Sequence, residues 1–167
     1  MLGLKWEDAD FEAGTLQVRR SLATAKGGPV LAAPKTRSSS RTVKLTHGAV
    51  EALRGHLQRQ LEEIDRAGSL WRENGLVFAS ETGEPLDRRY LTSRRFKALL
   101  RRAGLPDIRF HDLRHTCATL LLSKNVNPKI VSEMLGHASI AITLDTYSHV
   151  LPNMRDQAAA AMENALS

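Results

Sequence analysis

Apolar residues recur at helical spacing in the second half of the chain. Around residues 111–122, one helical face carries an apolar stripe made of Phe110, Leu113, Cys117, Leu120 and Leu121. A stripe with a 3.6-residue period predicts an amphipathic helix that buries this face in a core. Arg114 lies at the edge of the stripe, in the first turn of the predicted helix, where its guanidinium is partly removed from water.

Two further helices are predicted from their end signals. Asn127 can cap a helix, Pro128 suits its first position, and Gly136 suits the left-handed residue that ends it. His137 then projects from the turn. Ser139 can cap a following helix, and one side of that helix carries Ile140, Thr143, Leu144 and Tyr147.

The first half of the chain alternates between strand and helix patterns. The segments TLQVRRSL, GPVLAAPKT and RTVKLT are short, rich in β-formers and separated by Gly27-Gly28 and by residues 36–40, so they predict a three-stranded antiparallel meander. Residues 47–67 predict a polar amphipathic helix with one apolar face, made of Val50, Leu53, Leu57, Leu61 and Ile64. The pattern predicts an α+β fold, mainly α, in which a helical bundle carries a small three-stranded antiparallel sheet near the N-terminus.

Asp87 can start another helix, whose apolar residues are Tyr90, Phe96, Leu99 and Leu100. Its other face is strongly basic, with Arg88, Arg89, Arg94, Arg95, Lys97, Arg101 and Arg102. Such a face is either an ordinary solvated surface or a surface that lies along a DNA groove and gives salt-dependent affinity. On the second interpretation, Arg94 and Arg95 are candidate DNA contacts.

Composition narrows the class of protein. The chain has 167 residues, enough for one domain with a real core, and 24 Lys and Arg against 18 Asp and Glu give a net charge of +6. This basic balance suits a polyanionic partner. The single cysteine, Cys117, can form no internal disulfide, and we assign it to packing. Without a long apolar run or a signal-peptide pattern, we expect a soluble, cytoplasmic protein with no membrane partner.

Phosphate-ester chemistry is suggested by four side chains between residues 111 and 147. His111 and Arg114 stand three residues apart at a helix start, where free backbone N–H groups and the helix dipole add to the attraction for an anion. His137 follows in Leu-Gly-His, and Tyr147 comes ten residues later. Tyr147 is one of two tyrosines, and the other, Tyr90, fits no motif and is assigned to the core.

This ordered series, His-x-x-Arg, Leu-Gly-His and Tyr, resembles the catalytic end of the tyrosine recombinases, the phage-integrase family of site-specific DNA strand-exchange enzymes. The resemblance runs from Leu2 to about Val150. It implies a helical catalytic domain in which Tyr147 forms a 3′-phosphotyrosine intermediate, Arg114 and His137 hold phosphate oxygens, and His111 acts as acid or base. It also places the family's catalytic lysine at Lys35, on the second predicted hairpin turn, as the donor of a proton to the leaving oxygen.

Further expectations follow from the resemblance. DNA integration or recombination needs no metal and no other cofactor, and the partners are double-stranded DNA and copies of the same chain in a tetramer. Beside Lys35, Arg37 and Arg41 are expected to contact backbone phosphates. We expect residues 1–153 to be a truncated catalytic domain and residues 154–167 to be a C-terminal tail helix that docks on its own domain or on a neighbour.

The N-terminus departs from the family pattern. In the family, a helix that carries the first active-site arginine and then a glutamate runs directly into a segment that this chain matches at Leu2, Gly3, Leu4, Trp6, Asp8 and Asp10. Met1 occupies the position just after the glutamate. Losing such a donor costs about a hundred- to a thousand-fold in rate. We therefore expect this chain to be impaired as an enzyme.

Three alternatives remain open at this stage. The chain can be a non-catalytic DNA-binding or regulatory remnant of a recombinase. It can also be a metal-dependent nuclease built on His111, His115 and His137, although no third-ligand pattern supports this. A type IB topoisomerase shares the chemistry, but the short distance from Leu-Gly-His to Tyr147 resembles the integrases more.

Overall fold

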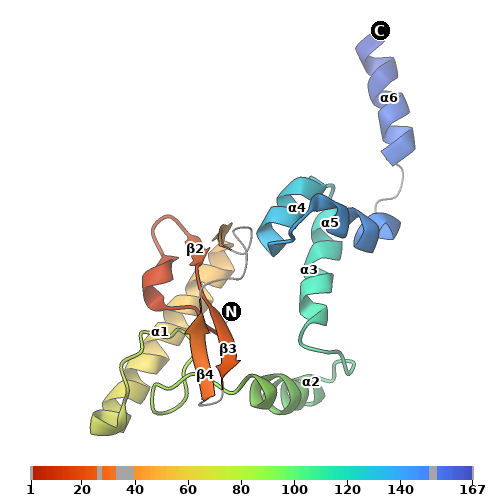
Figure 1. The fold of residues 1–167 in the computed structure, drawn as a ribbon. Helices are drawn as coiled ribbons and strands as arrows, with labels where there is room; N and C mark the ends of the chain where they lie inside the picture. The colour runs from red at the N-terminus through yellow and green to blue at the C-terminus, as the bar shows by residue number, and fades with distance from the viewer. Residues whose placement is uncertain (1, 26–27, 33–39, 151–153, 167) are drawn as a thin grey trace. The chain divides into compact units, whose positions relative to one another are not determined.

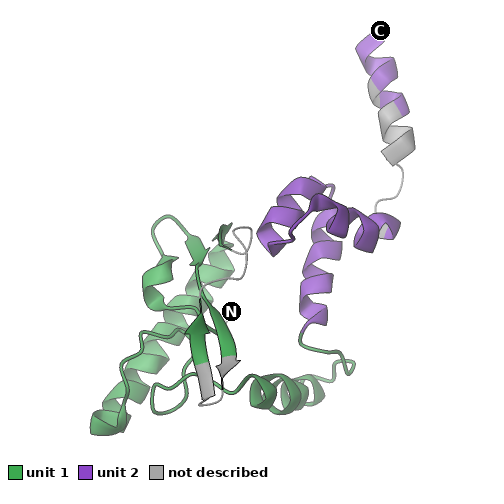
Figure 2. Ribbon diagram, in the orientation of Figure 1, with its two compact units in different colours: residues 1–110 green, residues 111–167 purple. Residues whose placement is uncertain are grey.

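The computed structural model describes residues 2–25, 28–32, 40–150 and 154–166. Its internal contacts divide the chain into two compact units, residues 1–110 and residues 111–167 (Figure 2). The structure is mainly helical with a small antiparallel sheet, which confirms the predicted fold class. No helix among the described residues is both long and apolar enough to cross a membrane.

The sheet of the first unit has three strands, but they are not the three that the sequence predicts. Strand β2 (Thr15–Val18) pairs antiparallel with β1 (Ala9–Asp10) on one side and with β5 (Arg41–Lys44) on the other. Among the described residues, β3 (Ser21–Ala25) and β4 (Gly28–Ala32) form a separate antiparallel pair (Figure 1), and in the sequence this pair comes between β2 and β5. The predicted meander of three consecutive strands is therefore wrong, because β1, β2 and β5 form the sheet and β3 and β4 form a separate pair.

The break between β2 and β3 has an electrostatic cause. Arg20 leaves the strand to pair with Asp8, whose Oδ2 lies 2.7 Å from the arginine Nη1, and with Glu7. Asp8 is buried at the end of a short 3-10 helix, η1 (Trp6–Asp8), so its charge needs a cationic partner. The segment TLQVRRSL consequently forms two strands rather than one.

Helix α1 (His47–Ala67) has the bounds that the sequence predicts. The Thr46 hydroxyl caps it by accepting a hydrogen bond from the Ala49 N–H at 3.2 Å. A 3-10 turn, η3 (Gly68–Leu70), follows. The predicted apolar face is only partly correct, because Val50 is buried whereas Leu61 is half exposed.

A buried polar residue of α1, Gln60, forms a hydrogen-bond network with the rest of the first unit. Gln60 is buried and accepts a hydrogen bond from the Trp6 indole N–H at 2.5 Å, while its amide nitrogen donates to the carbonyl oxygens of Leu76 and Val77. The His56 ring nitrogen Nε2 also lies 2.6 Å from the Val77 carbonyl oxygen. The core of the first unit is thus tied to the segment at residues 76–77 by side chains of α1.

The basic helix begins where the sequence predicts. The Asp87 carboxylate accepts a hydrogen bond from the Tyr90 N–H at 2.9 Å, and a π-helical turn, η4 (Tyr90–Arg95), runs into α2 (Phe96–Arg102). Phe96 is buried, and its ring meets that of Phe110 edge to face at 5.2 Å between centroids.

The second unit is helical. Its elements are α3 (Asp112–Ser123), α4 (Pro128–Leu135), α5 (Ile140–Tyr147), the 3-10 turn η5 (Ser148–Val150) and α6 (Met154–Leu166). The predicted end signals are confirmed: Asn127 caps α4, Gly136 ends it in the left-handed conformation, and Ser139 caps α5. A cluster of buried side chains joins three of these helices, namely Ala118, Leu122, Val131, Leu135 and Tyr147.

The buried face of α3 differs from the predicted stripe. Cys117 is exposed, and so are much of Leu113 and Leu120, whereas Ala118 and Leu122 are fully buried. The predicted stripe and the buried face both repeat at helical spacing, so the apolar pattern alone does not distinguish them. The buried face, which carries the small Ala118 side chain, is the one that packs against α4 and α5. His115 precedes Ala118 by three residues, so the same face of α3 carries it.

Candidate active site

Tyr147 is the last residue of α5, and its side chain is only 3% exposed. The ring belongs to the core cluster of the second unit, between α3 and α4 residues. Its hydroxyl oxygen lies 2.8 Å from Nδ1 of His115, and the two ring centroids are 5.8 Å apart. The phenol is therefore held by an imidazole on α3 within a largely apolar setting.

His111 and His115 form a ring pair on α3. They stand four residues apart, and their rings meet edge to face with centroids 5.3 Å apart. The spacing follows from the helical period, which stacks residues i and i+4 on one face. His111 contacts the His115 ring, and His115 contacts the phenol.

Arg114 shares an electrostatic environment with Tyr147. Burial lowers the pKa of the Arg114 guanidinium, and the nearby Tyr147 and Cys117 oppose this shift. Burial raises the pKa of the Tyr147 phenol, Arg114 acts to lower it, and Cys117 raises it further. The predicted partial desolvation of Arg114 is thus present, and its positive charge favours the ionised form of the phenol.

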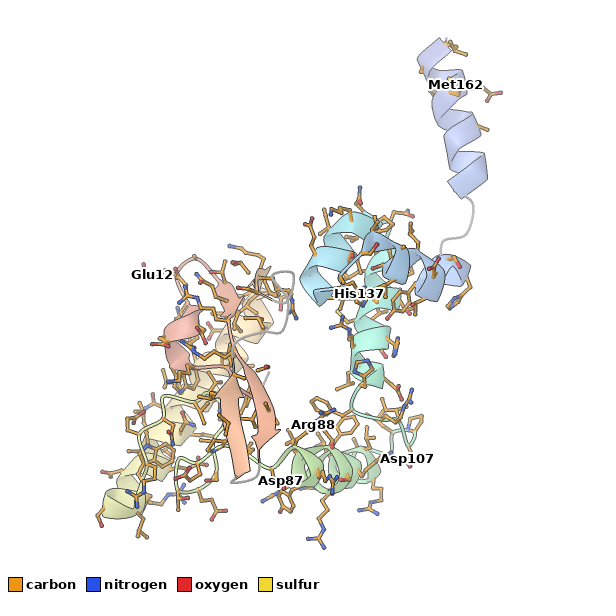
Figure 3. All side chains as sticks on the ribbon, viewed as in Figure 1. Glu12, Asp87, Arg88, Asp107, His137 and Met162 are labelled. Carbon is orange, nitrogen blue, oxygen red and sulfur yellow. The ribbon has the colours of Figure 1, made fainter. Side chains whose placement is uncertain are left out.

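His137 lies in the turn between α4 and α5 (Figure 3). Gly136 adopts φ 70° and ψ 41°, and the His137 N–H donates to the Ser132 carbonyl oxygen at 3.0 Å. The ring nitrogen Nδ1 lies 2.7 Å from the hydroxyl oxygen of Thr143, a side chain that is fully buried. When that hydroxyl donates to Nδ1, the neutral ring carries its hydrogen on Nε2, on the far side of the ring.

Helix α5 therefore organises two contacts one turn apart. Thr143 and Tyr147 occupy positions i and i+4, both are buried, and each touches a histidine. His111, Arg114, His137 and Tyr147 all belong to the second unit, as does His115. Arg114 and His137 can bind the oxygens of a phosphate ester. Tyr147, whose hydroxyl is hydrogen-bonded to His115, can attack its phosphorus.

The other predicted residues fall elsewhere. Lys35 and Arg37 lie outside the described residues. Arg41 is half-buried on β5, opposite Val18 in the sheet register. Arg94 and Arg95 are exposed on η4, and the Arg95 guanidinium lies 5.4 Å from the centroid of the Tyr90 ring. Their assignments as catalytic or DNA-binding residues stay predictions.

Sequence reasoning missed the contact residues His115 and Thr143. The sequence presents His115 only as a possible metal ligand, and Thr143 only as a residue on the same side of its helix as Tyr147. The signal for His115 was its helical spacing to Ala118 and Leu122, which form the buried face. Among the described residues, no three His, Cys, Asp or Glu side chains gather in a group able to hold a metal ion, so the geometry lends the nuclease alternative no support.

Comparisons with known proteins agree with one another. A family model described as the phage integrase family matches residues 1–154. The Tyrosine recombinase XerC-like protein of Caldanaerobacter subterraneus subsp. tengcongensis is 40% identical over 170 residues, covering 95% of this chain and 43% of the relative. The ICEBs1 integrase of Bacillus subtilis is 28% identical, over 99% of this chain and 45% of its own length.

Solved structures show the same likeness. The Tn1549 transposon integrase in complex with circular intermediate DNA superposes with a TM-score of 0.75 at 25% identity, covering 98% of this chain and 54% of that one. The XerH site-specific recombinase bound to its difH substrate gives a TM-score of 0.63 at 30% identity, covering 97% and 40%. The chain spans less than half the length of the two relatives that it matches by sequence. It belongs to the phage integrase family of tyrosine recombinases.

Proposed function

We propose that this chain carries the chemistry of site-specific DNA recombination, in which a DNA strand is cut and rejoined through a covalent link to Tyr147. The observation that carries the proposal is the position of the Tyr147 phenol. Its oxygen is hydrogen-bonded to His115 Nδ1 at 2.8 Å, and the positive charge of Arg114 acts on it. Family membership supports it, because the matched relatives are named as recombinases and integrases.

The reaction conserves the phosphodiester. The Tyr147 oxygen attacks the scissile phosphorus and loses its proton, the bond to the 5′ oxygen breaks, and a 3′-phosphotyrosyl link forms. The leaving 5′ oxygen takes a proton, for which the resemblance nominates Lys35. When the 5′-hydroxyl of a partner strand later attacks the link, the phenol is released and a phosphodiester is restored.

Arg114 and His137 are the proposed phosphate ligands. A guanidinium can hold non-bridging oxygens with paired hydrogen bonds, and its partial burial strengthens the attraction for the charge that develops in the transition state. His137, fixed at Nδ1 by Thr143, can donate from Nε2 to an oxygen of the same phosphate. His111 is the acid or base that the resemblance implies.

Double-stranded DNA is the proposed partner. The solved structure of the Tn1549 integrase is a complex with circular intermediate DNA, and that of XerH is bound to its difH substrate. This chain has a net charge of +6, with exposed arginines on η4 and α2. We further propose a tetramer on DNA, acting in the cytoplasm. Helix α6 supports assembly, since Met162 and Leu166 are 61% and 81% exposed and offer apolar surface to a neighbouring copy.

Covalent trapping tests the proposal. A pool of short nicked duplexes of mixed sequence is incubated in chelator with this chain, with Tyr147→Phe, and with a form that adds an arginine-bearing helix ahead of Met1. We expect a denaturant-resistant protein–DNA adduct that disappears in Tyr147→Phe. An adduct from the extended form alone shows that the first arginine is needed.

Two outcomes would overturn the proposal. If the extended form binds DNA and never forms an adduct, the chain is a DNA-binding module without strand-exchange chemistry. If Tyr147→Phe still yields an adduct while Tyr90→Phe does not, the nucleophile is the other tyrosine.

A further inference from the structure

The imidazole in contact with the proposed nucleophile, His115, has no role in the chemistry proposed above. We propose that His115 is a catalytic residue that accepts the proton from the Tyr147 hydroxyl when the phenol attacks phosphorus. This inference rests on the proposed function, and it moves the proton-accepting role from His111, where the resemblance places it, to the next turn of α3.

Geometry singles out His115. Its Nδ1 lies 2.8 Å from the phenol oxygen, within the range over which an O–H group donates to a ring nitrogen. His111 contacts the His115 ring edge to face and is in ring contact with the acceptor rather than with the phenol. Tyr147 is 3% exposed, so bulk water has little access to take the proton in place of the imidazole.

The surroundings of the phenol make an acceptor necessary. Burial raises the pKa of Tyr147, and although Arg114 acts in the opposite direction, the net shift is upward. A phenol that holds its proton is a weak nucleophile near neutral pH. An adjacent ring nitrogen that accepts the proton during attack makes a free phenolate unnecessary.

The proposed step balances. The O–H bond of Tyr147 breaks as an N–H bond forms on His115 Nδ1, and the electron pair left on oxygen forms the bond to phosphorus. The P–O bond to the 5′ carbon's oxygen then breaks, and that oxygen takes a proton from the ammonium of the proposed acid, Lys35. In the rejoining step His115 returns its proton to the departing phenol.

The state of the ring is the first test, and it needs no DNA. Nitrogen-15 spectra of the imidazoles in the whole chain, assigned by comparison with His115→Asn, report which nitrogen carries hydrogen. We expect neutral His115 to have its hydrogen on Nε2 and a bare Nδ1, with a change in the Nδ1 signal in Tyr147→Phe. A neutral ring protonated at Nδ1 donates to the phenol and would overturn the inference.

The second test separates proton acceptance from packing. The rate of adduct formation on the nicked duplexes is measured for the extended form with His115→Asn, which keeps a polar atom near the Nδ1 position but is not basic. Loss of a general base typically costs about a hundred-fold or more, and we expect a loss of that order. Thr116→Ala, on the exposed side of the same helix, serves as the control and should keep its rate.

A more acidic nucleophile sharpens that test. Replacing Tyr147 by 3-fluorotyrosine gives a phenol that ionises more readily and needs an acceptor less. The deficit of His115→Asn should therefore shrink several-fold in this background, whereas the deficit of His111→Asn should not. An equal deficit with both phenols would assign His115 to packing and overturn the inference.

The failures of the two proposals are distinguishable. No adduct from any form would overturn the proposed function itself. An adduct that forms at an unchanged rate in His115→Asn would overturn only the role of His115.

Discussion

Burial and a nearby positive charge act in opposite directions on the pKa of the Tyr147 phenol. Its burial in the cluster with Ala118 and Leu122 disfavours the phenolate, and the charge of Arg114 favours it. The core position also fixes the ring, so that the hydroxyl meets His115 in a defined geometry. Because Tyr147 is a core residue, its fixed position comes with a raised pKa of the phenol, which the charge of Arg114 partly offsets.

Arg114→Gln should raise the pKa of the Tyr147 phenol further. The substitution removes the positive charge that stabilises the phenolate and leaves the burial that destabilises it. Ultraviolet titration on a Tyr90→Phe background follows this phenol alone, since the chain has two tyrosines. Arg102→Gln, an exposed arginine of the first unit, is the matched control and should leave the titration in place. A pKa that falls or stays constant in Arg114→Gln would contradict the assigned coupling.

Thr143→Val should slow adduct formation while the chain stays folded. Valine has nearly the same shape as threonine but cannot bond to Nδ1 of His137, so the ring loses one partner that fixes its orientation. We expect about 1 kcal/mol of lost stability, the ordinary value of one hydrogen bond. Far-UV circular dichroism during urea unfolding follows the helices of the whole chain, which include those of the second unit, and trapping follows the chemistry. Thr143→Ser, which keeps the hydroxyl, should recover most of the rate, and its failure to do so would contradict the positioning role.

At the scale of elements, local signals predicted what local chemistry determines. The bounds of α1, the caps at Asn127 and Ser139 and the left-handed Gly136 follow from hydrogen bonds between residues close in sequence. Such cap hydrogen bonds form between residues only a few positions apart, so they do not depend on tertiary contacts. The order of His111, Arg114, His137 and Tyr147 likewise identified the family without any contact being known.

Tertiary partners decided what the sequence did not predict. Arg20 ends a strand pattern because Asp8, twelve residues earlier, is buried and charged. Gln60 lies inward because Trp6 and the carbonyl oxygens of Leu76 and Val77 need its amide. His115 meets Tyr147 because α3 packs through Ala118 rather than through its larger apolar stripe. Each choice depends on residues remote in sequence, which periodicity alone cannot weigh.

Two glycines should respond to alanine in opposite directions. Gly83 has φ +80°, and an added Cβ would clash with the carbonyl oxygen of Arg72, so Gly83→Ala should cost about 3 kcal/mol. Gly48 lies in α1 with nothing within 4 Å of an added Cβ, so Gly48→Ala should stabilise by about 0.5–1 kcal/mol. Tryptophan fluorescence during urea unfolding reports on both, because Trp6 and Trp71 lie in the first unit. A neutral Gly83→Ala would contradict the close approach of the Gly83 backbone to Arg72.

Gln60→Leu should destabilise the first unit despite adding apolar surface. It removes the acceptor of the Trp6 indole N–H and a donor to two carbonyl oxygens, and an unsatisfied buried group costs about 1–3 kcal/mol. The same fluorescence measurement applies, and the emission of Trp6 should change in the folded state. Gln58→Leu, an exposed position on α1, is the control, and equal stability of the two variants would contradict the network.

At the scale of the whole molecule, the basic face of η4 and α2 and the proposed nucleophile belong to different units. The proposed nucleophile and phosphate ligands are in residues 111–167, whereas the basic face of η4 and α2 is in residues 1–110. Within that face Lys97 pairs with Asp107, which leaves the exposed arginines as its main surface charge.

Arg94 and Arg95 should contribute to DNA affinity through phosphate contacts rather than base contacts. If each contacts one phosphate, replacing one by alanine should weaken binding to duplexes of any sequence and reduce the slope of log affinity against log salt by about 1. Fluorescence anisotropy with two unrelated duplexes over a range of salt concentrations measures both effects. Arg59→Ala removes the same charge from α1 and tests whether position matters, because a uniform effect of net charge would weaken all three variants equally. A loss confined to one duplex sequence would instead assign the changed arginine to a base, since phosphate contacts carry no sequence information.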